Sequence, residues 1–313
     1  MSVMAVVVKS ADIPREDAVK IGFTVFTASI PVSMIFLTGD ASINPLAAAS
    51  CDPEPVGWLK WFEVMGLPMI VTSIITMVMI LFMFKPTKEV NVNKTEILEK
   101  LEAMGPMSGK ELRTAVWVTL AIILWMTDTL HGIDIGWLFI AMGMAMPKIG
   151  GILTPQSWSG VPVQTLIFLT AAVAIGRVGG ATGMNTWIAQ TVLPSSVPEN
   201  MFILAAFITA VSIAIHMLFG SVIAVMGIVI PAMLAFTGSM GISTIIPVMI
   251  AYIAINAHFI LPFHNLAILV GVGEDNGMYT EKETIKFGVP FTIVLFIITV
   301  GVAVPWWKVI GLW

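Results

Sequence analysis

The sequence predicts an all-α polytopic membrane protein. Of its 313 residues, 58% are hydrophobic and 11% are charged, and the mean hydropathy is +0.96, so the chain is far more apolar than a soluble domain. Apolar runs long enough to enter a bilayer recur along the chain, and polar stretches interrupt two of them. The single cysteine, Cys51, excludes an internal disulfide and a metal site built of cysteines.

The N-terminal part of the chain has the outline of a re-entrant hairpin. Met1–Val8 is apolar but too short to span the hydrocarbon, which needs about 20 residues, and it lacks the basic region of a signal peptide. A polar turn, Lys9–Lys20, follows. The apolar run Ile21–Leu37 then ends in the small and polar stretch Leu37–Pro45, a pattern that favours a hairpin over a clean span.

One clear spanning helix and one hydrophilic linker come next. We expect Trp58 and Trp61 to lie in a loop as interfacial anchors, followed by a spanning helix over Gly66–Phe84. The segment Lys85–Arg113 holds six of the 15 Lys and Arg residues, and the positive-inside tendency places it in the cytoplasm. Within it, Thr95–Leu101 has the spacing of a short amphipathic helix.

The second half of the chain adds further apolar runs, each bounded by glycine, proline or polar residues. They cover Ala115–Met126, Ile135–Met146, Val163–Gly176, Met201–Phe219, Val222–Phe236, Ile245–Phe259 and Val289–Val304. The first two form either two spans that close at a polar turn or one helix with a shorter partner. The whole chain therefore has about seven to nine membrane elements.

The stretch Ala257–Gly273 is the strongest candidate for a site. It places a proline, two histidines and an asparagine between apolar residues, at a depth where hydrocarbon is expected on both sides. Irregular polar backbone is tolerated inside a bilayer only where protein buries it or where it lines a cavity. We therefore interpret this break as functional.

An internal repeat organises the chain. Asn44 and Asn265 are 221 residues apart, and Pro68 and Pro290, each opening a long apolar helix, are 222 apart. Broken segments at matching places in two halves indicate a secondary transporter, with the substrate and the coupling ion between the halves. We divide the chain into residues 1–86 (the end of the first repeat), 87–114 (a cytoplasmic amphipathic linker) and 115–313 (the second repeat).

The same offset exposes an unmatched half-site. The break Phe219–Ser221 precedes a helix in the second repeat, and its counterpart would fall at or just before Met1. We therefore expect the chain to be the C-terminal part of a longer transporter or a natural truncation. The alternative is a membrane subunit without transport activity, or a remnant that needs a partner half.

Several short motifs resemble the divalent anion:sodium symporter family. They are Ala28-Ser29-Ile30, Leu37-Thr38-Gly39, Asn44-Pro45, Trp61, Gly66-Leu67-Pro68, Leu124-Trp125-Met126-Thr127 and Trp306. The resemblance implies an inverted-repeat transporter with re-entrant helical hairpins and broken helices. It also implies a homodimer with elevator-like motion that carries dicarboxylates, citrate or sulfate.

The resemblance also implies where substrate and sodium bind. Members of the family carry a Ser-Asn-Thr motif at a hairpin tip, where this chain has Ser221-Val222-Ile223. The facing tip of this chain reads Pro262-Phe263-His264-Asn265 and is shorter than the usual form. Because valine and isoleucine side chains offer no oxygen to a hard cation, sodium at this tip would depend on backbone carbonyls.

The residues themselves suggest how an anion and a cation would be held. Helix N-termini, close backbone approach at glycine and directed side-chain donors suit an anion. The candidate substrate-binding residues are Thr38, Gly39, Gly220, Ser221, Pro262, His264 and Asn265. The candidate cation-binding residues are Ser29, Asp40 and Asn44. His264 either donates to a carboxylate, titrates to couple transport to protons, or merely satisfies a neighbouring carbonyl.

Other function classes are disfavoured. No His-Glu-x-x-His run or Walker-type loop occurs, and the four histidines are dispersed in the sequence, so we predict neither an enzyme nor an ATP-driven pump. His216 and His258 are expected to be structural, and Arg177 either snorkels to the interface or clamps an anion. We predict a sodium- or proton-driven transporter of dicarboxylates, tricarboxylates or sulfate in the plasma or inner membrane, with no cofactor beyond the coupling ion and no nucleic-acid partner.

Overall fold

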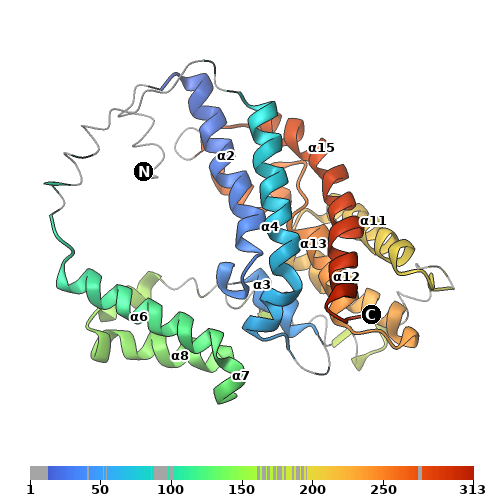
Figure 1. Ribbon diagram of the computed structural model, residues 1–313, viewed down its shortest axis with the longest axis horizontal. Helices are drawn as coiled ribbons and strands as arrows, with labels where there is room; N and C mark the ends of the chain where they lie inside the picture. The colour runs from blue at the N-terminus through green and yellow to red at the C-terminus, as the bar shows by residue number, and fades with distance from the viewer. Residues whose placement is uncertain are drawn as a thin grey trace. The chain divides into compact units, whose positions relative to one another are not determined.

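The computed structural model describes most of the chain. The described residues are 13–40, 42–51, 53, 55–85, 87, 98, 102–103, 105–160, 196–273 and 277–313, with scattered positions between 163 and 194. They form helices and no strand, which confirms the predicted all-α class (Figure 1). The chain divides into a larger unit (residues 1–56, 60–90 and 169–313) and a smaller one (57–59 and 91–168), and each is described by itself.

Four helical segments among the described residues are long and apolar enough to cross a membrane, as a polytopic membrane protein requires. They are α4 (Trp58–Met83), α11 (Met201–Phe219), α12 (Val222–Thr237) with its extension to Met240, and α15 (Glu281–Ile298) continuing through η6 (Thr299–Ala303) and α16 (Val304–Val309). All four belong mainly to the larger unit. A shorter apolar helix, α13 (Ile245–Asn256), is buried along nearly its whole length.

Both predicted breaks have the same local structure. In the first, α2 (Arg15–Ser33) leads through the 3-10 turn η1 (Leu37–Gly39) to the short helix α3 (Ile43–Ala49). In the second, α13 leads through η5 (Pro262–His264) to α14 (Leu266–Gly271). A long apolar helix follows each break, α4 in the first case and α15 in the second. The repeat found in the sequence is therefore a repeat of structure.

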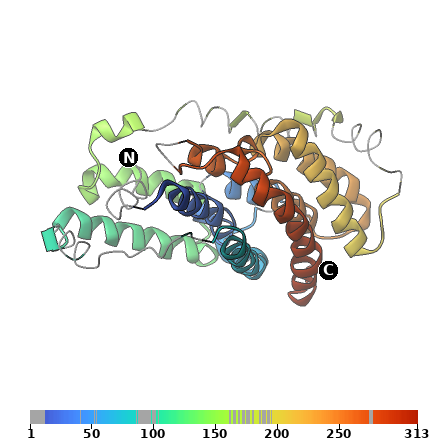
Figure 2. The ribbon, with the colours of Figure 1, turned by 90° about the horizontal axis from the view of Figure 1, so that it is seen from above.

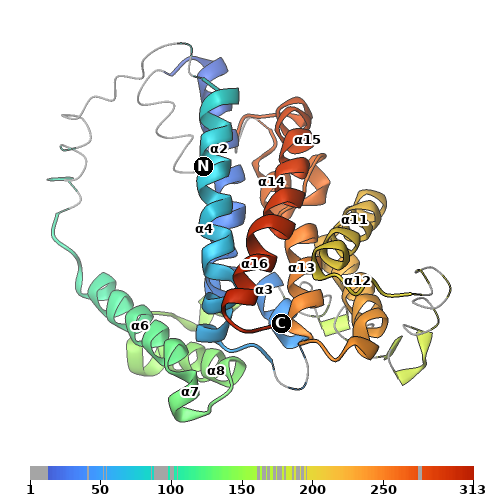
Figure 3. The same ribbon diagram turned by 45° about the vertical axis from the view of Figure 1, so that its right-hand side comes forward.

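The two copies of this unit run in opposite directions. At one end of α4, the Met83 carbonyl accepts a hydrogen bond from Lys286 Nζ near the start of α15, at 3.2 Å. At the other end, the Val64 carbonyl accepts from Trp307 Nε1 in α16, at 2.9 Å. The two helices are thus antiparallel neighbours, as Figures 1 and 3 show. The matched elements are inverted, as the resemblance implied.

Aromatic packing joins the inverted elements. The ring of Phe23 in α2 lies 4.9 Å from that of Phe84, 5.2 Å from that of Tyr279 and 5.7 Å from that of Phe287 in α15, between centroids. Phe23, Tyr279 and Phe287 are fully buried. Because aromatic rings in tilted and edge-on pairs attract one another, this cluster holds α2 to the first turns of α15.

Three helix starts differ from the sequence prediction. Helix α4 begins at Trp58 rather than Gly66, and Trp61 is fully buried with its Nε1–H donated to the Met34 carbonyl at 3.1 Å, so Trp61 is a core residue and its predicted loop position is wrong. Helix α15 begins at Glu281 rather than Val289, because Thr280 and Glu283 form a capping box. Helix α2 begins at Arg15, inside the predicted polar turn.

The smaller unit bears on one open alternative. The apolar runs after the linker form α6 (Gly109–Met126), of 18 residues, and α8 (Ile135–Ala145), of 11 residues, joined by the single turn α7 (Asp128–His131). This arrangement matches one helix with a shorter partner. The π-turn η2 (Met146–Gly150) and the 3-10 turn η3 (Pro155–Gly160) follow. The predicted linker helix Thr95–Leu101 and the run Val163–Gly176 lie largely outside the described residues, and Arg177 lies outside them.

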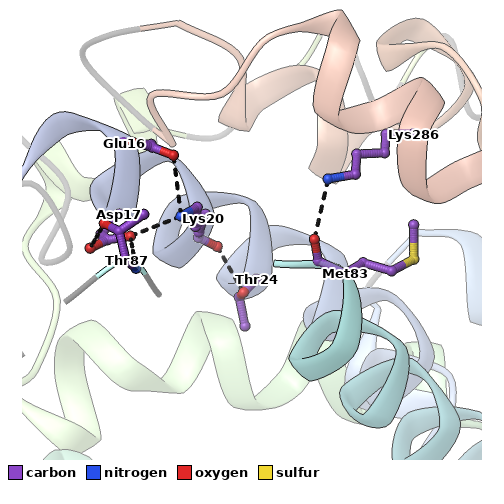
Figure 4. A network of polar contacts seen from close by, with 7 residues as sticks. All are labelled: Glu16, Asp17, Lys20, Thr24, Met83, Thr87 and Lys286. Atoms are coloured by element: carbon purple, nitrogen blue, oxygen red, sulfur yellow. Dashed lines mark hydrogen bonds and ion pairs between the residues drawn. The ribbon is translucent and has the colours of Figure 1, made fainter. Parts of the chain in front are cut away.

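One buried carboxylate fixes the end of α4 to the start of α2 (Figure 4). Asp17 is 1% exposed and accepts hydrogen bonds from Thr87 N at 2.8 Å, Thr87 Oγ1 at 2.7 Å and Lys20 Nζ at 3.0 Å. The neighbouring Glu16 has a 72% exposed side chain and lies 3.6 Å from the same Lys20 nitrogen. Two adjacent carboxylates in one helical turn therefore have very different surroundings.

Replacing Asp17 with alanine should lower the free energy of unfolding by about 2 kcal/mol, because hydrogen bonds to a charged group are lost. Equilibrium unfolding in mixed detergent micelles measures this change. Glu16→Ala is the matched control, since it removes a carboxylate from the same turn but only an exposed ion pair, and we expect a change below about 0.5 kcal/mol. Equal effects of the two substitutions would contradict the role given to Asp17.

Candidate functional site

The tip between α11 and α12 is built by two residues. Gly220 has a φ of 63° and donates its N–H to the His216 carbonyl at 2.9 Å, which ends α11 in a left-handed cap that favours glycine. Ser221 then caps α12, because its Oγ accepts from Ala224 N at 3.4 Å. The two helices of this hairpin lie in the gold and orange region in the view from above (Figure 2).

The tip packs directly against the second break. A Cβ added at Gly220 would lie 2.7 Å from Cε2 of the Phe263 ring and closer still to Cδ2, so a larger residue here would displace this ring, which is 52% exposed. The Phe263 ring in turn packs edge-on against His264, at 4.7 Å between centroids. The structure therefore brings Gly220 together with the segment Pro262–Asn265, as the sequence predicted for a two-sided site.

Gly220→Ala should lower the free energy of unfolding by about 2 kcal/mol, because it adds displacement of the half-exposed Phe263 ring to the backbone strain. Gly241 has a similar φ of 66°, yet nothing lies within 4 Å of an added Cβ. Gly241→Ala thus measures backbone strain alone, which is about 1 kcal/mol. Unfolding measurements on both variants separate the two effects, and equal losses would show that the Phe263 contact is unimportant.

A buried hydrogen-bond network connects the two breaks. Asn44, fully buried, donates from Nδ2 to the Ser33 carbonyl at 2.8 Å and the Phe36 carbonyl at 2.9 Å. Its Oδ1 accepts from the hydroxyl of Tyr252, and that hydroxyl accepts from Asn256 Nδ2 at 3.2 Å.

The network reaches the second break through Asn265. Its Nδ2 donates to the Asn256 carbonyl at 2.8 Å and its Oδ1 accepts from Ala267 N at 2.9 Å, so the side chain joins the end of α13 to the start of α14. Asn44 and Asn265, which the repeat pairs in sequence, each tie a break to the helix before it. This arrangement satisfies the backbone groups that a broken helix would otherwise leave unpaired at membrane depth.

The other residues predicted at the first break have local roles. An added Cβ at Gly39 would lie 2.9 Å from the Ser33 carbonyl carbon, so this glycine lets the turn pack closely on the end of α2. Asp40 Oδ1 accepts from Ser42 N at 2.8 Å and Ile43 N at 2.9 Å, and the partly exposed Thr38 lies between Leu37 and Gly39 in η1. Ser29 is exposed in α2, and its hydroxyl donates to the Phe26 carbonyl at 2.7 Å.

Three histidines come together beside the tip. The ring of His216 lies 5.3 Å from that of His258 and 5.3 Å from that of His264, and the last two are 5.6 Å apart, between centroids. All three are fully buried. We call these residues the histidine cluster. The sequence predicted only His264 as functional and His216 and His258 as structural, whereas the structure places all three at the tip and the second break.

Sequence reasoning also missed Tyr252 and Asn256. They are four residues apart on α13, so they lie on one face of the helix, within an otherwise apolar run. Tyr252 is one of two tyrosines in the chain. A tyrosine and an asparagine at this spacing in an apolar helix were a usable signal, because each needs a partner when buried.

Comparisons with known proteins agree with this architecture. A sequence model described as the sodium:sulfate symporter transmembrane region matches residues 4–313. Dicarboxylate transporter 1, chloroplastic, of Arabidopsis thaliana is 26% identical over 93% of this chain and 53% of its own length. A membrane protein of Cupriavidus necator is 24% identical over 82% and 52% of the two chains, and the putative malate transporter YflS of Bacillus subtilis is 26% identical over 59% and 39%. The chain spans about half the length of the first two of these relatives.

Proposed function

Because the chain belongs to the sodium:sulfate symporter family, we propose that it is a secondary active transporter of small anions. The substrate class is dicarboxylates, tricarboxylates or sulfate, and the coupling ion is sodium or a proton. The protein acts as a homodimer in a plasma or inner membrane. The observation that carries this proposal is that the hairpin tip packs on the second of two inverted breaks, with Gly220 against Phe263.

The tip offers donors that suit an anion. Helix α12 begins at Val222 and is 16 residues long, so its first-turn N–H groups and the positive end of its dipole lie at the tip. Ser221 Oγ accepts from Ala224 N, a bond that does not use the hydroxyl proton. An anion bound here would receive hydrogen bonds from backbone and side-chain donors without a full positive charge on the protein.

Cation binding at the first break is the second part of the proposal. Ser29, Asp40 and Asn44 carry oxygens of the hard kind that sodium prefers. Both N–H groups of Asn44 are donated to carbonyls and its Oδ1 accepts from Tyr252, so sodium would share that oxygen with the tyrosine. Asp40 supplies the negative charge.

Uptake into liposomes tests the proposal. The purified chain should accumulate radiolabelled malate under an inward sodium or proton gradient, and unlabelled sulfate or citrate should compete if they are substrates. Each gradient applied alone identifies the coupling ion. Absence of uptake under every gradient by a folded protein would overturn the proposal and favour the alternative of a membrane subunit without transport activity.

Two substitutions test the site. Ser221→Ala removes a hydrogen bond to the charged ligand, and Asn265→Ala removes a side chain that positions the second break. Each substitution should reduce uptake about tenfold, since such a loss costs about 1.5 kcal/mol. Ser243→Ala is the matched control, because Ser243 Oγ also accepts a helix N-terminal N–H at 3.4 Å, from Ile245. Unchanged uptake in both site variants would reject this site assignment.

A further inference from the structure

The histidine cluster is a buried group that the proposed transport function leaves unexplained. His216 precedes the tip by one turn of α11. His258 and His264 lie near the two ends of the irregular segment between α13 and α14. In all three rings Nε2 is buried and has no hydrogen-bond partner among the described residues. A polar atom at membrane depth is costly without a partner, so three of them in one place indicate a ligand.

Hydrogen bonds assign the proton on His264. Its Nδ1 accepts from Ile260 N and from Leu261 N, each at 3.1 Å. A ring nitrogen that accepts hydrogen bonds carries no proton, so the neutral ring must carry its proton on Nε2. His264 therefore presents a fixed Nε2–H donor.

The other two histidines share one proton between them. Nδ1 of His258 lies 3.2 Å from Nδ1 of His216, so one of these nitrogens donates and the other accepts. The neutral ring that donates has a bare Nε2, and the ring that accepts has an Nε2–H. The neutral cluster thus offers two Nε2–H donors and one bare Nε2.

We infer that the histidine cluster is a proton-coupled anion subsite, which takes up one proton with each bound anion. The proton comes from solution and binds to the bare Nε2 of the His216–His258 pair, with no other bond made or broken. All three Nε2 atoms are then donors and the cluster carries one positive charge, which suits a carboxylate or sulfate oxygen. This inference rests on the proposed transport function and selects the proton as a coupling ion.

Most other titratable groups on the packed elements have partners of their own. Tyr252 lies in the asparagine network and Asp40 caps α3. Near the ends of α15 and α16, the described charged groups are Glu281, Lys282, Glu283, Lys286 and Lys308. Glu283 bonds Thr280, Lys286 bonds Met83 and Lys308 lies over the Trp313 ring.

A metal ion is a poorer ligand for the cluster than a proton with an anion. Among the described residues, no three His, Cys, Asp or Glu side chains are placed so that they could hold a metal ion. The Nδ1 contact between His216 and His258 also requires a proton between the two nitrogens, as described above.

Calorimetric titration of the purified protein with malate and with sulfate tests this inference. Repeating each titration in buffers with different ionisation enthalpies counts the protons taken up, and we expect one per anion. Measured between about pH 6 and 9, the dissociation constant should rise with pH by up to about tenfold per unit, because each binding event takes up a proton. Model carboxyl groups are fully ionised in this range, so the proton does not come from malate.

Variants locate the proton. His216→Gln and His258→Gln should bring the count close to zero, whereas His264→Leu should weaken binding about tenfold at every pH and keep a count of one. His131→Gln is the control, because both ring nitrogens of His131 are hydrogen-bonded, to Leu124 O at 2.8 Å and Ile133 N at 3.0 Å, and it should keep a count of one. Binding without proton uptake by the unmodified protein overturns the inference, whether or not the variants fold. An unchanged proton count in both glutamine variants also overturns it. If neither malate nor sulfate binds at any of the pH values tested, the proposed function is rejected instead.

Discussion

Asn44→Ala is expected to lower the free energy of unfolding by about 4 kcal/mol. The substitution removes a fully buried carboxamide and leaves the Ser33 and Phe36 carbonyls and the Tyr252 hydroxyl without their partner. Each buried polar group left unpaired costs about 1–3 kcal/mol, which places the total among the largest effects of single substitutions. Equilibrium unfolding in mixed micelles, followed by tryptophan fluorescence, measures the change.

Graded variants separate the parts of this effect. Tyr252→Phe removes only the hydroxyl and should lower the free energy of unfolding by about 1–2 kcal/mol. Ser29→Ala is a null control, because the Ser29 side chain is exposed and bonds only within its own helix. If Asn44→Ala is no more destabilising than Ser29→Ala, the network does not hold the first break in place.

The repeat was predictable because its signals are local. A proline and an asparagine in apolar runs interrupt helical hydropathy wherever they occur, and the shared offset of Asn44 and Asn265 pointed to two copies. The structure adds the direction of the copies, which the bonds Lys286–Met83 and Trp307–Val64 reveal.

The helix starts were not predictable from hydropathy. The first turns of α4 and α15 carry charged residues, such as Lys60, Glu63, Glu281 and Glu283, which a search for apolar runs counts as loop. Capping signals were available at Thr280 and Glu283, since a threonine three residues before a glutamate predicts a helix start.

The histidine cluster and the asparagine network needed three-dimensional information. His216 and His258 are 42 residues apart and Asn44 and Tyr252 are 208 apart, so no helical spacing connects them. Taken singly, each histidine in an apolar run is most simply a structural residue. Only the packing of the hairpin tip on the second break shows that the three histidine rings are neighbours.

Gly288→Ala should lower the free energy of unfolding by about 3 kcal/mol, although alanine is normally the better helix former by about 1 kcal/mol. Gly288 lies inside α15, and an added Cβ would lie 2.9 Å from Ile260 Cα and closer still to the Phe259 carbonyl oxygen. Both are backbone atoms of the second break, so the break must move. Because Ile260 N donates to His264 Nδ1, we also expect weaker binding of malate.

The repeat supplies the matched control for this variant. Gly66 occupies the corresponding position 222 residues earlier, but the three atoms nearest to its added Cβ all belong to the ring of Phe62, with Cε2 at 3.0 Å. That side chain is 39% exposed and can turn aside, so Gly66→Ala should leave stability unchanged or raise it by up to about 1 kcal/mol. If the two substitutions change the free energy of unfolding in opposite directions, α15, unlike α4, holds a break by direct backbone contact. Equal effects would show that Gly288 has no such role.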